Sequence, residues 1–159
     1  MLMLVSEVMT EDVVRIDMDT TMSEIRDRFE LTRFRHAVVI EEGRVVGVIS
    51  DRDLLRTVSP FVGKLAERRQ DLASLDRKAH QVMTRELVTV RPESLAVDAA
   101  MLMHDRRISC VPVVNADGHC VGVFTWRNAL AWAAEAVARE RGFCLVREDE
   151  GKGRVGEAA

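Results

Sequence analysis

Two short polar motifs follow apolar runs in this sequence. Ser50-Asp51-Arg52-Asp53 comes after residues 45–49, and Thr125-Trp126-Arg127-Asn128 comes after residues 120–124. A hydroxyl where a strand gives way to a helix lies beside the outward-pointing amides of the helix start, and this combination accepts an anion such as phosphate. A carboxylate three residues later has two acceptor oxygens that suit a pair of vicinal hydroxyls. The same spacing is typical of an ordinary capping box, so the residue types alone leave both roles open.

Both motifs belong to an internal repeat. Val8-Met9-Thr10 recurs as Val82-Met83-Thr84, an offset of 74 residues. The offset is 75 where Glu42-Gly43 recurs as Asp117-Gly118, so one residue has been added just before the second turn. A predicted hairpin tip is where a duplicated unit tolerates an insertion. The repeat therefore predicts two copies of one structural unit.

Each copy predicts the element order β-α-β-β-α. Strands are expected over residues 13–16, 37–40 and 45–49, and again over 87–90, 111–114 and 120–124. Helices are expected around the apolar positions 22–29 and 95–103, with closing helices over 51–58 and 127–139. Thr20 or Thr21 with Glu24, and Ser94 with Asp98, are helix-start signals. Each small sheet is apolar on both faces, which predicts an α/β fold (α+β type) whose copies pack sheet to sheet with pseudo-two-fold symmetry.

The expected organisation has four parts. The first repeat spans residues 5–58, a partly helical connecting segment spans 59–81, and the second repeat spans 82–138. The polar, glycine-rich residues 142–159 are expected to form a mobile tail.

The ordered motifs resemble a known family. Val-Met-Thr, a valine strand, a helix, an apolar strand, a glycine turn and a final Gly-h-h-Ser/Thr-x-x-Asp signature (h is apolar) are similar to a CBS domain. Residues 47–53 match that signature in full, whereas Asn128 stands where the family has Asp. The resemblance covers about residues 5–135, and the two copies resemble a stand-alone CBS pair, or Bateman module.

The resemblance implies a regulatory module that binds an adenine nucleotide (AMP, ADP or ATP) in a cleft between the repeats. The main cleft would draw residues from both copies: Ser50, Asp53, Arg52, Val48, Arg35, His36, Ile108, Ser109 and Cys110. The pseudo-symmetric cleft would use Thr125, Asn128, Arg127 and Phe34, with Arg35 and His36. This second site is expected to be weaker, because the Asn128 amide cannot make a charge-assisted hydrogen bond. No cofactor is required, although magnesium could bridge bound phosphates.

A signal from such a module would act in trans, through conformation or oligomeric state, on an effector protein that the sequence does not name. The alternative is a dimerisation or protein-interaction module with vestigial clefts. Its homodimer face would use apolar positions of the closing helices: Leu54, Leu55, Leu130, Trp132 and Ala133.

Catalysis and metal binding are not expected. Cys110 could be a nucleophile activated by His36, but nothing supplies a third, orienting group. The four histidines share no ligand-type spacing with a cysteine or carboxylate cluster.

Composition excludes several other classes. The formal charge of −3, the 4% of aromatic residues and the absence of tyrosine indicate neither a basic field nor a stacking platform for nucleic acid. No apolar run approaches the roughly 18 residues that span a membrane. Three cysteines without a C-x-x-C pair indicate reduced thiols in a cytoplasmic protein.

Overall fold

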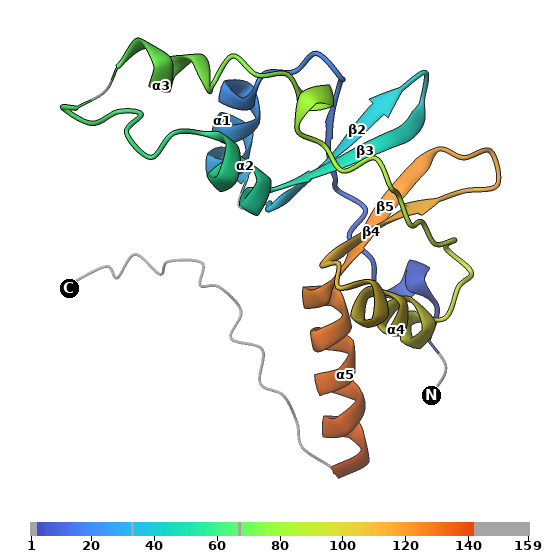
Figure 1. Ribbon diagram of the computed structural model, residues 1–159. Helices are drawn as coiled ribbons and strands as arrows, with labels where there is room; N and C mark the ends of the chain where they lie inside the picture. Colours follow the sequence, from blue (N-terminus) through green and yellow to red (C-terminus); the bar gives the residue numbers. More distant parts are fainter. Residues whose placement is uncertain (1–2, 33, 67, 142–159) are drawn as a thin grey trace, which may run out of the picture.

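The computed structural model describes residues 3–32, 34–66 and 68–141 (Figure 1). The first repeat contains β1 (Val14–Ile16), α1 (Met22–Thr32), β2 (His36–Glu41), β3 (Arg44–Ser50) and α2 (Asp51–Thr57). The second contains α4 (Ala96–Arg106), β4 (Cys110–Val114), β5 (Cys120–Thr125) and α5 (Trp126–Arg141). The tail expected over residues 142–159 lies outside the described residues. The two repeats thus have the expected mixed α/β architecture.

The strand expected over residues 87–90 is reduced to one bridge. In the first repeat β1 pairs in parallel with β2 over three residues, and β2 pairs antiparallel with β3. In the second repeat only Val90 forms a parallel bridge, to Val113. Pro112, the counterpart of Val38 in β2, has no N–H to donate to this side of β4, which shortens the ladder. The prediction of a full strand is therefore wrong at residues 87–89.

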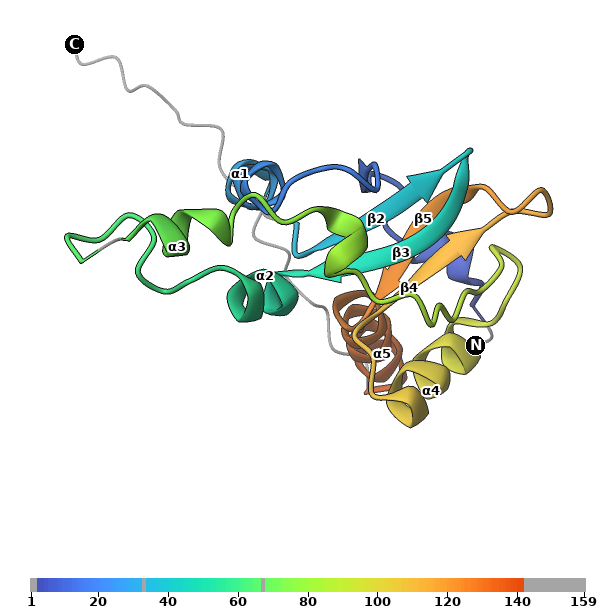
Figure 2. The same cartoon turned by 45° about the horizontal axis from the view of Figure 1, so that its top comes forward.

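The two hairpins pack against each other, as the apolar faces predict. Val13 and Val38 from the first repeat form one buried cluster with Cys110 and Val123 from the second. In both views the β2–β3 hairpin lies against the β4–β5 hairpin (Figures 1 and 2). Both hairpins carry a register shift at the same place, between Val39 and Ile40 and between residues 113 and 114. The duplication thus extends to the irregularities of the strands.

The two repeats exchange their leading segments, defined as residues 5–10 and 79–84. Each begins with a 3-10 turn, η1 (Val5–Glu7) and η2 (Ala79–Gln81). Val5 is buried against the α4 face of the second repeat, and Ala79 and Met83 are buried in the core of the first. The leading segments also bridge to the opposite sheets, Thr10 to Val123 and Thr84 to residue 48. Each repeat therefore completes its core with a piece of the chain that precedes the other repeat.

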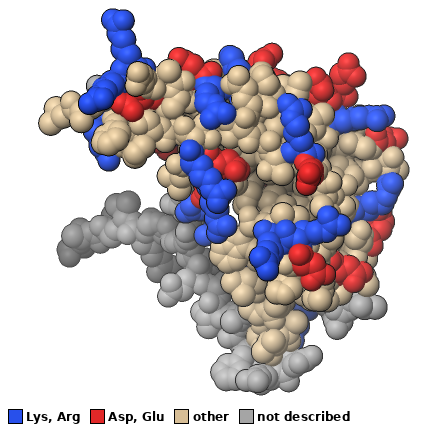
Figure 3. All heavy atoms as spheres, viewed as in Figure 1, with Lys and Arg blue, Asp and Glu red and all other residues tan. Residues whose placement is uncertain are grey.

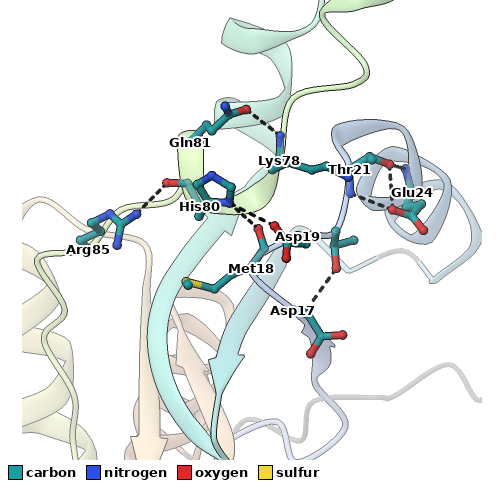
Figure 4. Close-up of polar contacts among 10 residues, drawn as sticks. Asp17, Met18, Asp19, Thr21, Glu24, Lys78, His80, Gln81 and Arg85 are labelled. Atoms are coloured by element: carbon teal, nitrogen blue, oxygen red, sulfur yellow. Dashed lines mark hydrogen bonds and ion pairs between the residues drawn. The ribbon is translucent and has the colours of Figure 1, made fainter.

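Polar contacts fix the second leading segment to the first repeat (Figure 4). The His80 backbone N–H donates to the Met18 carbonyl at 3.0 Å, and His80 Nδ1 lies 3.0 Å from the same oxygen. The Ala79 backbone N–H donates to the Thr20 carbonyl at 2.8 Å. The start of α1 is thereby held against η2.

The two helix-start signals have different outcomes. The Thr21 backbone N–H donates to Glu24 Oε2 at 2.7 Å, and the Glu24 N–H donates to Thr21 Oγ1 at 3.2 Å, so the capping box is confirmed. The Ser94 signal is wrong, because Leu95 occupies the N-cap of α4 and has no side-chain acceptor. The Met3 carbonyl accepts from the Ala96 N–H instead, at 2.8 Å. The backbone just before the first leading segment therefore caps α4.

The connecting segment contains the five-residue helix α3 (Arg69–Ala73), and its other described residues up to η2 are turn and loop, apart from a bridge between Lys78 and Thr21. It is fastened at Ser59, whose hydroxyl donates to Asp71 Oδ1 at 2.5 Å and whose N–H donates to Ser74 Oγ at 3.0 Å. Among the described residues, no helix is long and apolar enough to span a membrane.

Candidate functional site

Ser50 and Asp53 meet at the junction of β3 and α2. The Ser50 N–H donates to Asp53 Oδ2 at 2.8 Å, and its hydroxyl donates to the same oxygen at 2.6 Å. The Asp53 N–H lies 3.4 Å from Ser50 Oγ, which completes a capping box. Both bonds from Ser50 end on one carboxylate oxygen, and Oδ1 accepts no hydrogen bond from the described residues. The pair therefore caps α2 and still presents an acceptor to a ligand.

A cleft of about 270 Å³ opens in front of this pair. It brings together eight of the nine residues expected for the main cleft: His36, Val48, Ser50, Arg52, Asp53, Ile108, Ser109 and Cys110. Arg35 does not line it, because its guanidinium forms a 2.6 Å ion pair with Asp51 and lines the opposite cleft. We call the 270 Å³ cleft in front of Ser50 and Asp53 the smaller cleft.

Sequence reasoning missed several walls of the smaller cleft. Thr84 ends the second leading segment, Glu86, Leu87 and Val88 come from the chain that follows it, and Arg56 and Arg107 come from helix ends. The 74-residue offset identifies corresponding residues of the repeats. This offset does not show that each leading segment packs on the other repeat, so these lining residues could not be predicted from the sequence.

The smaller cleft is lined by more cationic than anionic side chains. Arg52, Arg56 and Arg107 face two carboxylates, Asp53 and Glu86. Within the described part of the chain, none of these three guanidinium groups forms an ion pair or a hydrogen bond. On the molecular face drawn in Figure 3, by contrast, basic and acidic side chains are intermixed with no broad field of one sign. Positive charge is thus available inside the cleft itself.

The pseudo-symmetric cleft has a volume of about 570 Å³, and we call it the larger cleft. All six residues expected for the second site line it: Phe34, Arg35, His36, Thr125, Arg127 and Asn128. Asn128 Oδ1 accepts from the Thr125 N–H at 2.8 Å and from its hydroxyl at 2.6 Å, which repeats the cap of the first repeat. Trp126 and Trp132 also line this cleft. The position of Trp126 beside Thr125 left open whether it lines a pocket or covers the core, whereas Trp132 was considered only for the homodimer face.

His36 is the one described residue that lines both clefts. Its Nε2 lies 3.1 Å from Ser109 Oγ, so this contact joins the two repeats. Burial lowers the pKa of His36 below its usual 6.5, although the neighbouring Asp51 and Asp53 act in the opposite direction. The ring is therefore neutral at physiological pH.

The geometry gives no support to the Cys110 nucleophile. His36 contacts Ser109, and burial raises the pKa of the Cys110 thiol to about 12. A thiol in that environment stays protonated and unreactive. Across the residues that the structure describes, no three His, Cys, Asp or Glu side chains gather as a metal site.

The apolar positions considered for a homodimer face divide into two groups. Leu55 and Leu130 are 79% and 59% exposed, and Ala133 is also exposed. Leu54 packs on the core of the first repeat and Trp132 on the core of the second. Leu54 and Trp132 are thus partly buried by packing within the chain.

Comparison with known proteins supplies the family. The CBS domain model matches residues 5–60 and 79–135. A CBS domain-containing protein of Dictyostelium discoideum is 31% identical over 132 residues, which make up 82% of this chain and 90% of that protein.

Two solved structures share the fold. The CBS domain pair of protein MJ0100, in complex with 5′-methylthioadenosine and S-adenosyl-L-methionine, has a TM-score of 0.71 at 20% identity and covers 86% of this chain and 99% of that one. CBSX2 in complex with AMP has a TM-score of 0.66 at 24% identity, over 84% of this chain and 98% of that one. With both repeats matched by the family model and the tandem fold shared, this chain belongs to the CBS domain family as a tandem CBS pair.

Proposed function

We propose that this chain is a regulatory module that binds an adenine nucleotide in the smaller cleft. The observation that carries the proposal is Asp53 Oδ1, which accepts no hydrogen bond from the described residues, in a cleft with three arginines that have no partner among those residues. AMP is bound by CBSX2 and adenosyl compounds by the MJ0100 pair, which supports an adenine-containing ligand. CBS pairs are regulatory modules rather than enzymes, and the protonated state of Cys110 agrees with that role.

The smaller cleft offers a group for each part of a nucleotide. Asp53 Oδ1 would accept hydrogen bonds from the ribose hydroxyls, in a charge-assisted geometry. Ser50 acts as a positioning residue, because its two hydrogen bonds fix the carboxylate. Arg52 and Arg56 would receive the phosphates, and magnesium could join them there when more than one phosphate is present.

A ligand in this position would contact both repeats. Arg107 and Ile108 belong to the second repeat, whereas Arg52 and Asp53 belong to the first. Binding would therefore favour one relative packing of the repeats, and an effector protein or a second copy would sense the change. The regulatory signal would therefore act in trans, on a separate protein molecule.

Thermal unfolding with AMP, ADP, ATP and GMP, with and without magnesium, tests the proposal. A nucleotide at one hundred times its dissociation constant stabilises the folded state by about 2.7 kcal/mol. Asp53→Asn should abolish that shift, because it removes the charge yet keeps the cap, as Asn128 shows in the second repeat. Asp76→Asn, a change of the same type on the exposed connecting segment, should keep the shift. Absence of a shift with every nucleotide, or an unaltered shift in Asp53→Asn, would overturn the proposal.

A homodimer is a second candidate role, and one observation favours it. Trp126, Leu130 and Val137 are 49%, 59% and 51% exposed along α5, at the spacing of one helix face. Sedimentation equilibrium would test whether this face pairs two copies. Leu130→Lys should then shift the protein to monomer, and Leu72→Lys on the connecting segment should not.

A further inference from the structure

The chain between α2 and α3 forms a loop that projects from the first repeat. In both views this part of the chain lies away from the two packed hairpins (Figures 1 and 2). Pro60 prevents α2 from continuing, because proline has no N–H to donate and its ring clashes with the preceding turn. Gly63 has a φ of 74°, which glycine adopts without strain. We call residues 60–66 the projecting loop.

One carboxylate closes the base of the projecting loop. Asp71 accepts a hydrogen bond from the Ser59 hydroxyl at 2.5 Å and another from the Arg68 N–H at 2.8 Å. The residues on either side of the loop are therefore held by the same group. Inside the loop, the Lys64 N–H donates to the Phe61 carbonyl at 3.1 Å. A surface loop with its ends held together and turns of its own keeps a defined shape, so its tip is presented to the surroundings in a fixed form.

The tip of the projecting loop is apolar. Leu65 is fully exposed and Phe61 is half exposed, although both are large hydrophobic side chains. Neither belongs to a buried cluster of the described residues. In Figure 3 this part of the molecule, at the upper left, is a tan projection with basic side chains beside it. The apolar surface is thus convex, and contact with a second molecule or a lipid surface would remove it from water.

Cationic side chains flank the apolar tip. Lys64 lies within the loop and Arg68 and Arg69 follow it, and all three are exposed. Residues 60–70 contain these three basic residues and one acidic residue, in a chain whose formal net charge is −3. Positive charge is therefore concentrated around the tip against the sign of the whole chain. Such a local charge asymmetry favours an anionic partner.

We propose that the projecting loop binds the surface of an anionic lipid bilayer, with its apolar tip in the interface and its three cations against the headgroups. A convex tip enters a bilayer interface directly, whereas a protein partner would have to supply a matching hollow. Apolar burial and attraction to anionic headgroups then act together. A loop of this kind lies at the interface and does not span the bilayer. None of these residues lines either cleft, so the assignment does not depend on the proposed nucleotide site.

Co-sedimentation of the full chain with lipid vesicles tests the assignment. One set of vesicles contains equal amounts of phosphatidylcholine and phosphatidylglycerol, and the other contains phosphatidylcholine alone. The partition coefficient should be about tenfold higher for the anionic vesicles, because exposed cations gain free energy near a negative surface. Added salt should weaken this binding, since the Debye length falls to about 10 Å at 0.1 M ionic strength.

A pair of substitutions tests the apolar tip. Phe61→Ser combined with Leu65→Ser should lower the partition coefficient for anionic vesicles by about tenfold, because less apolar surface leaves water. Leu31→Ser combined with Met101→Ser is the matched control, since both side chains are exposed and lie outside the loop. This control should bind as the native chain does. All four positions are exposed, so urea midpoints close to the native value would show that the fold is intact.

A second pair tests the cations. Arg68→Gln combined with Arg69→Gln should also lower the partition coefficient by about tenfold. Arg91→Gln combined with Arg106→Gln changes the net charge of the chain equally at exposed sites elsewhere, and it should have little effect.

Three results would overturn the assignment. The first is equal binding to the two kinds of vesicle, or no binding to the anionic ones. The second is a loss of binding in either control pair as large as in the matching loop pair. The third is a native chain that is dimeric in sedimentation velocity without vesicles and becomes monomeric with Phe61→Ser and Leu65→Ser, because a second copy would then cover the loop.

Discussion

The side-chain amide of Asn128 donates a 2.8 Å hydrogen bond to the carbonyl oxygen of Val8, across 120 residues of sequence. A carboxylate, which accepts but does not donate, could not form this bond. At the position where the first repeat has Asp53, the second repeat thus has a residue that holds the first leading segment in place. The departure from the family pattern therefore has a structural role, whether or not a ligand binds nearby.

Asn128→Asp should destabilise the protein. The change removes the donors to Val8 and Thr10 and sets a carboxylate against the Val8 carbonyl. The expected loss in free energy of unfolding is about 1–3 kcal/mol, the range for unpaired polar groups. Urea denaturation measures this loss. Amide exchange at Thr10, whose N–H donates to the Val123 carbonyl at 2.9 Å, should also accelerate.

The reverse exchange is the control. Asp53→Asn keeps both capping hydrogen bonds, and the chain has Val82 and Thr84 as the counterparts of Val8 and Thr10 under the 74-residue offset. Its free energy of unfolding should stay within about 0.5 kcal/mol of the native value or rise. Equal losses in free energy of unfolding in the two variants would contradict the stabilising role that we assign to the Asn128 hydrogen bonds to Val8 and Thr10.

Alanine substitutions at Gly47 and Gly122 should have unequal costs. A Cβ at Gly122 would lie 2.9 Å from the Thr10 carbonyl oxygen as well as close to Met9, whereas the three atoms nearest a Cβ at Gly47 all belong to the Met83 side chain. Backbone yields less than a methionine side chain, so Gly122→Ala should be the more destabilising, by about 1–3 kcal/mol for an overpacked site. Urea midpoints of the two variants give the comparison.

Double-mutant cycles test whether the methionine side chain or the backbone sets the cost of alanine at Gly47 and at Gly122. Met83→Ala should relieve much of the cost of Gly47→Ala, which appears as a favourable coupling energy. Met9→Ala should relieve little of the cost of Gly122→Ala, because the Thr10 carbonyl remains. Similar coupling in both cycles would show that the methionine side chains alone set the cost.

The elements and the capping pairs could be predicted from the sequence because they depend on local patterns. The apolar runs before Ser50 and Thr125 indicated strands, and the spacing to residues 53 and 128 indicated the caps. The exchange of leading segments could not be predicted, since Met9 and Met83 have the same neighbours in sequence whichever repeat they pack on. For the same reason, the sequence did not reveal that Met83 fills the space next to Gly47.

Stability should fall as the pH drops below about 6.5, in part because of His36. Burial lowers the pKa of His36 in the folded protein, so the unfolded chain binds a proton first on acidification. The contribution is fully present above the usual pKa of 6.5 and is lost as the pH falls toward the folded value. Asp51 and Asp53 oppose the shift, whereas Arg52 and Arg35 act with it. Urea midpoints between pH 7.5 and pH 5 would measure the slope.

His36→Gln is the test variant, because glutamine keeps a polar contact to Ser109 but does not titrate. Its urea midpoints should depend less steeply on pH over the same interval. A slope equal to that of the native protein would assign the pH dependence to other groups. A steeper slope would show that His36 binds its proton more readily in the folded state.

Cys110 should be unreactive toward thiol reagents while the protein is folded. Burial raises its pKa from 9.0 to about 12, which lowers the thiolate fraction near pH 8 by about a thousandfold. Since Cys120 is only half-buried and Cys144 lies outside the described residues, the measurement needs the Cys120→Ser, Cys144→Ser background. Reaction with a chromogenic disulfide should then be complete in urea and negligible over the same time without it. Rapid reaction in the folded protein would mean that Cys110 reaches solvent as a thiolate, and it would reopen the nucleophile hypothesis.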